Sequence, residues 1–121
     1  MRIAAIGDLH CTIESSGKIA RIFEGVEKEA DIVVLAGDLT NVGLVEEMEV
    51  LLEELKTVRL PIIAVVGNND HENDQADLLT NMMTGSDICV LDCNTCEVEG
   101  IGFIGAKGFC GGFMKHRVQP L

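Results

Sequence analysis

Three apolar runs constrain the fold of this chain more than any other feature, because each ends in a glycine followed by a polar residue. The runs occupy residues 3–8, 32–38 and 62–68. They are rich in isoleucine and valine and do not alternate with polar residues, which is typical of strands covered on both faces. The runs therefore predict three strands in the interior of one sheet.

Amphipathic segments separate the three runs. Apolar residues recur at helical spacing over residues 19–30 and again over residues 44–55, as expected for helices with one buried side. The polar residues that follow the runs are Asp8, Asp38 and Asn68, with spacings of 38 − 8 = 30 and 68 − 38 = 30, the length of a strand–helix–strand unit. We therefore predict an α/β fold with a mostly parallel sheet and flanking helices.

The pattern is weaker after Asn68, and no linker or domain boundary is visible. A chain of 121 residues, set against about 150 per domain, predicts one domain over residues 1–121. Residues 105–112 are rich in glycine and predict a loop. The other expected elements are a helix ending near Gly85, a short strand at 88–91, and a hairpin of segments 96–98 and 101–104 around Glu99-Gly100.

The charge and the apolar content exclude several classes of partner. With 9 basic and 20 acidic residues, the net charge is −11, which disfavours non-specific binding to nucleic acid or to anionic membranes. The longest apolar run, residues 60–67, has eight residues, far fewer than the roughly 18 needed to cross a bilayer. The five cysteines are an odd number, and the N-terminus lacks a signal-peptide pattern, so we expect reduced thiols in a cytoplasmic protein.

Four side chains able to bind a metal follow the predicted strands. They are Asp8, His10, Asp38 and Asn68. Because ligands bind at the carboxyl ends of parallel strands, we expect these side chains to meet at one edge of the sheet. Carboxylates, an imidazole and an amide oxygen suit Mn, Fe, Ni or Zn. Each aspartate alone is more often a turn residue or helix cap, but the four together favour a metal site.

These residues form three motifs in a fixed order: Asp8-Leu9-His10, Gly37-Asp38 and Gly67-Asn68-Asn69-Asp70. The order resembles the calcineurin-like metallophosphoesterase superfamily, whose motifs run D-x-H, G-D and G-N-H-D/E, and the resemblance covers about the first 70 residues. It implies that Asp8 and His10 bind a first divalent metal, that Asp38 bridges two, and that Asn68 binds the second. It also implies hydrolysis of phosphoric monoesters or diesters by a metal-bound hydroxide, with Asp38 and Asn68 as catalytic residues.

The chain departs from the family pattern in two respects. Asn69 stands where the family has a histidine that assists the leaving group. The family also supplies further histidine ligands from a second half, in G-H and G-H-x-H motifs, whereas this chain has only His10, His71 and His116. The resemblance therefore implies a C-terminally truncated domain. The alternative to a phosphoesterase is a catalytically inactive metal-binding or assembly module.

The resemblance to the superfamily also has implications for the fold and for oligomerisation. The family is a sandwich of two sheets with helices outside, and this chain supplies the first sheet and one hairpin of the second. An apolar sheet face without its covering layer is expected to find a partner. We therefore expect a homo-oligomer in which a second copy covers that face.

Overall fold

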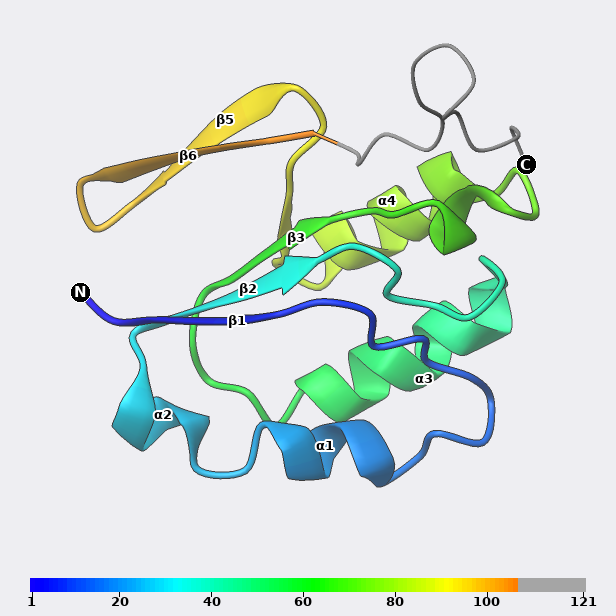
Figure 1. Ribbon diagram of the computed structural model, residues 1–121, viewed down its shortest axis with the longest axis horizontal. Helices are drawn as coiled ribbons and strands as arrows, with labels where there is room; N and C mark the ends of the chain where they lie inside the picture. The colour runs from blue at the N-terminus through cyan, green and yellow to red at the C-terminus, as the bar shows by residue number, and fades with distance from the viewer. Residues whose placement is uncertain (107–121) are drawn as a thin grey trace, which may run out of the picture.

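A four-stranded parallel sheet organises the computed structural model, which describes residues 1–106 (Figure 1). The strands are β1 (Ile3–Ile6), β2 (Ile32–Ala36), β3 (Ile62–Val65) and β4 (Cys89–Val90), and they lie in the order β1-β2-β3-β4. All three neighbouring pairs are parallel. The predicted α/β fold with a parallel sheet is confirmed.

The helices cover one face of this sheet. They are α1 (Lys18–Ile22), α2 (Val26–Glu29), α3 (Val45–Leu55) and α4 (Ala76–Gly85), with a short 3-10 helix η1 (Asn69–His71) after β3. Figure 1 shows α1, α2 and α3 on the side of the sheet opposite the hairpin. Fully buried residues from the sheet and two helices, including Leu35, Met48 and Leu79, form one core cluster. This core fixes the sheet whose strand ends carry the predicted ligands.

One predicted helix is two short helices in the structure. The apolar spacing over residues 19–30 predicts a single helix, but α1 ends at Ile22 and α2 begins at Val26. Gly25 lies between them with φ of 78°, a left-handed conformation that glycine adopts without steric penalty. The chain therefore turns at Gly25 while Ile19 and Phe23 stay buried.

The opposite face of the sheet is partly covered by a hairpin of β5 (Asn94–Val98) and β6 (Ile101–Gly105). Its two turn residues, Glu99 and Gly100, both have positive φ, as a type I′ hairpin turn requires. The hairpin packs Cys96 and Phe103 against buried residues of the sheet. The predicted hairpin is thus confirmed, and it forms part of a second layer.

The hairpin does not cover the edge strand β1. Ile3 pairs in register with the buried Ile32, yet Ile3 is 49% exposed and Ala5 on the same face is exposed as well. The predicted homo-oligomer would cover this strip, and it stays a prediction.

None of the helices over residues 1–106 is long and apolar enough to cross a membrane. Most of the predicted glycine-rich loop, residues 107–112, lies outside the described residues, as does His116.

Candidate metal centre

The segments that follow β1 and β2 run side by side at the carboxyl edge of the sheet. The backbone amide of Asp8 donates to the carbonyl of Gly37 at 3.1 Å, and the amide of His10 donates to the carbonyl of Asp38 at 2.9 Å. The parallel pairing of the strands therefore continues beyond the sheet. It places the D-x-H segment directly against the G-D segment.

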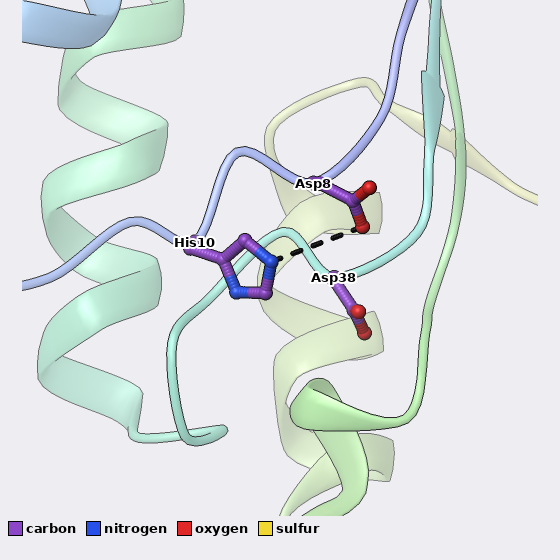
Figure 2. Close-up of side chains that lie close together, drawn as sticks. All are labelled: Asp8, His10 and Asp38. Carbon is purple, nitrogen blue, oxygen red and sulfur yellow. Dashed lines mark ion pairs between the residues drawn. The ribbon is translucent and has the colours of Figure 1, made fainter.

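Three of the predicted ligands share an unusual backbone conformation. The φ angles of Asp8, His10 and Asp38 are 56°, 47° and 49°. Residues other than glycine rarely adopt this left-handed conformation, although Asp, Asn and His tolerate it best. Such strained residues cluster at functional sites. Figure 2 shows the imidazole of His10 directed toward the carboxylate of Asp8, with the side chain of Asp38 beside them.

Asp8, His10 and Asp38 form a compact cluster of ligand atoms. One ligand atom from each residue lies within 4.8 Å of the others. Within residues 1–106, these three side chains form a group that could hold a metal ion. Nε2 of His10 is 3.8 Å from Oδ1 of Asp8. Two carboxylates and an imidazole are a donor set that suits divalent Mn, Fe, Ni or Zn. The residues present therefore fit the metal that the motifs imply.

A pocket of about 320 Å³ opens beside this cluster. Asp8, Asp38 and Asn68 line it, together with residues of the glycine-containing turns after β2 and β3. Its volume lies at the lower end of the roughly 300–1,000 Å³ that is usual for small-molecule sites. Asn68, the fourth predicted ligand, thus faces the same space as the two carboxylates.

A comparison with known protein families decides how this pocket is interpreted. The sequence profile described as Calcineurin-like phosphoesterase (Metallophos) matches residues 1–110. The chain belongs to this family. The match extends beyond the three motifs and through the β5–β6 hairpin, and members of the family are metal-dependent phosphoesterases. No curated protein matches the chain.

Asp70, the last residue of the third family motif, holds the site together, a role that our sequence analysis did not assign. Its side chain is fully buried. Oδ1 accepts hydrogen bonds from the amide and hydroxyl of Thr40, at 2.8 Å and 2.6 Å. Oδ2 accepts from the amides of Leu39 and Gly67, at 3.1 Å and 2.8 Å. Asp70 therefore ties the loop that carries Asp38 to the loop that carries Asn68.

Asn69, at the position of the family's histidine, contacts two of the candidate ligands. Its backbone amide donates to Oδ1 of Asp38 at 2.9 Å. Its side-chain amide nitrogen lies 3.0 Å from Nδ1 of His10. His71, two residues further on, is exposed and stands outside the ligand cluster. The signal that could have indicated the role of Asn69 is its place in the motif, next to Asn68.

The close approach of two loops makes Gly67 a sensitive position. A Cβ atom at Gly67 would collide with the amide nitrogen and the carboxylate of Asp38. We expect Gly67→Ala to lower the free energy of unfolding by about 1–3 kcal/mol through overpacking, measured by urea denaturation. Gly85→Ala is the matched control, because a Cβ there meets nothing within 4 Å. A Gly67→Ala protein as stable as the Gly85→Ala protein would contradict this close packing.

Proposed function

We propose that this chain hydrolyses phosphate esters in the pocket beside Asp8, His10 and Asp38. The observation that carries the proposal is the cluster of ligand atoms within 4.8 Å of one another beside a pocket lined by two of its members. Asp8 and His10 would hold a first divalent metal, Asp38 would be shared, and Asn68 would hold a second. Two such ions supply Lewis acidity and a nucleophile at neutral pH.

The charge of the pocket supports a requirement for metal. Asp8 and Asp38 line it, and none of the described lining residues is a lysine or an arginine. The chain as a whole carries a net charge of −11. A phosphate ester would therefore be repelled by the protein alone, and cations at the two carboxylates reverse the local charge.

The chain's own residues would orient the ligands. The backbone amide of Asn69 holds one oxygen of Asp38, which leaves the other oxygen available. The absence of a side chain at Gly67 lets its backbone approach Asp38 closely. An asparagine side chain does not act as a proton donor to a leaving group, so we expect substrates with an acidic leaving group, such as aryl phosphodiesters.

Asn69 also favours a second candidate function. A chain that lacks the family's histidine could bind metal without turnover and serve as a metal-binding or assembly module. Metal binding by itself does not distinguish the two functions, whereas hydrolysis does. A cytoplasmic location remains part of the proposal.

Removal of metal is expected to abolish hydrolysis. We expect the Mn²⁺-loaded protein to hydrolyse bis(p-nitrophenyl) phosphate, followed by release of p-nitrophenolate, and the rate to fall to the protein-free background with EDTA. Excess Mn²⁺ should restore the rate, because the carboxylates alone repel the substrate. Mn²⁺ binding without turnover would favour the second candidate, and turnover that survives EDTA would contradict the metal-dependent mechanism.

A further inference from the structure

Asn69 contacts the ligand cluster of Asp8, His10 and Asp38, and the proposed hydrolysis does not use its side chain. The residue lies in η1 and is half-buried. Its side-chain amide meets Nδ1 of His10, which is 59 positions away in the sequence. The other ring nitrogen of His10, Nε2, faces Asp8 (Figure 2). The two nitrogens of one imidazole thus face two different partners.

These partners decide which nitrogen carries the proton. A neutral imidazole has one N–H donor and one acceptor nitrogen, and the hydrogen bond made by one nitrogen sets the state of the other. An ion shared by His10 and Asp8 must be reached by the Nε2 lone pair, because Nε2 is the nitrogen on that side. The proton must then sit on Nδ1, opposite Asn69.

The asparagine side chain can serve both states. In the structure the amide nitrogen faces Nδ1 at 3.0 Å, and a donor there holds the form protonated at Nε2. Rotation of the amide by half a turn places Oδ1 opposite Nδ1, with nearly the same shape. The oxygen then accepts from Nδ1–H and leaves the Nε2 lone pair free.

We propose that Asn69 is a positioning residue that selects the tautomer of His10. Its amide nitrogen stabilises the metal-free form, and its amide oxygen stabilises the form that binds metal. Each form carries one proton on the imidazole ring, since Nε2 loses a proton to solvent and Nδ1 takes one up. The backbone amide of Asn69 holds Asp38 in either state. The role in metal binding rests on the proposed function, but the link between Asn69 and the tautomer does not.

Two variants distinguish the role of the Asn69 amide nitrogen as a donor from the role of its amide oxygen as an acceptor. In Asn69→Asp the side chain only accepts at neutral pH, so the metal-free protein should shift to the form protonated at Nδ1. In Asn69→Leu neither bond forms, and we expect Mn²⁺ to bind about 10- to 100-fold more weakly, the usual effect of removing such a supporting hydrogen bond. Asn81→Leu on α4 is the matched control, because Asn81 is exposed and does not line the pocket.

Nitrogen NMR of the imidazole measures the tautomer directly. Spectra of ¹⁵N-labelled protein are recorded above the pH at which the imidazole signals stop changing, so that the neutral imidazole is compared in every variant, with and without diamagnetic Zn²⁺. The spectrum of His10→Gln identifies the His10 signals. The native protein should change from Nε2–H to Nδ1–H when Zn²⁺ is added, and Asn69→Asp should show Nδ1–H without metal. Circular dichroism checks that each variant is folded.

The outcomes distinguish this inference from the proposed function. If Asn69→Asp leaves the His10 tautomer unchanged in the metal-free protein, the inference is wrong whatever the metal does. If Asn69→Leu binds Mn²⁺ as tightly as the native protein and the Asn81→Leu control, it is wrong as well. If the native protein binds neither ion while Asn69→Asp shifts the tautomer, the proposed function fails and the link between Asn69 and His10 stands.

Discussion

Replacing Asp38 with asparagine is expected to lower metal-dependent phosphodiester hydrolysis by about 10³-fold or more. Asp38 is the carboxylate that both proposed ions would share, and removal of one preorganised charged group from such a site has effects of this order. Asparagine is the sharpest substitution because it tolerates the left-handed backbone at Asp38. Its oxygen can also still accept the hydrogen bond from the amide of Asn69. The variant therefore removes charge and little else.

Initial rates with Mn²⁺ and bis(p-nitrophenyl) phosphate, together with Mn²⁺ affinity, test this prediction. Asp77→Asn is the matched control, because Asp77 is exposed in the first turn of α4 and its loss should leave both values unchanged. Asp38→Ala should be at least as inactive and also less stable, since alanine is strained at φ of 49°. If the activity of Asp38→Asn lies within tenfold of the native value, the proposal that both ions share Asp38 is wrong.

Replacing Asp70 with alanine is expected to have the largest effect on stability. The substitution leaves three buried backbone amides without an acceptor, those of Leu39, Thr40 and Gly67. Each unsatisfied donor is costly, and we expect the free energy of unfolding to fall by about 3–5 kcal/mol, as when a buried charge network is broken. Since domains are stable by only about 5–15 kcal/mol, the substitution would remove a large share of the total stability.

Urea denaturation followed by circular dichroism measures this loss. Asp70→Asn keeps the shape and one acceptor oxygen, so its loss should be smaller than that of Asp70→Ala. Asp77→Ala is the control for removing a carboxylate from an exposed position. An Asp70→Ala protein within about 1 kcal/mol of the native one would show that the four hydrogen bonds to Asp70 contribute little, contrary to the usual strength of bonds to charged acceptors.

The parallel sheet and the position of the candidate site at its carboxyl edge could be predicted because the sequence patterns that indicate them are local. Apolar runs that do not alternate with polar residues indicate a strand buried on both faces. All three runs form neighbouring parallel strands. Once the strands are parallel, their ends lie at one edge, so the proximity of Asp8 and Asp38 follows from topology. The break at Gly25 was not predicted, since the apolar spacing of Ile19, Phe23 and Val26 continues through it.

The supporting contacts of the site could not be read from local pattern. Asp70 bonds to amides 30 and 31 positions away, and Asn69 meets His10 across 59 positions. Burial of a carboxylate depends on how many backbone donors converge on it, and periodicity carries no information about that. The candidate ligands could be named from the sequence because each follows a strand, whereas the residues that support them are brought there by the packing of one loop on another.

The left-handed backbone at Asp8, His10 and Asp38 limits how this centre can be re-engineered. Side chains such as Glu or Cys at those three positions would combine a new donor with a distorted main chain, so an attempt to change metal preference there confuses two effects. Asn68 differs, because its φ of −62° and ψ of −42° are ordinary right-handed helical values, which L-amino acids adopt without strain. Among the four proposed ligands, Asn68 is therefore the one whose side chain can be exchanged without a change in backbone strain.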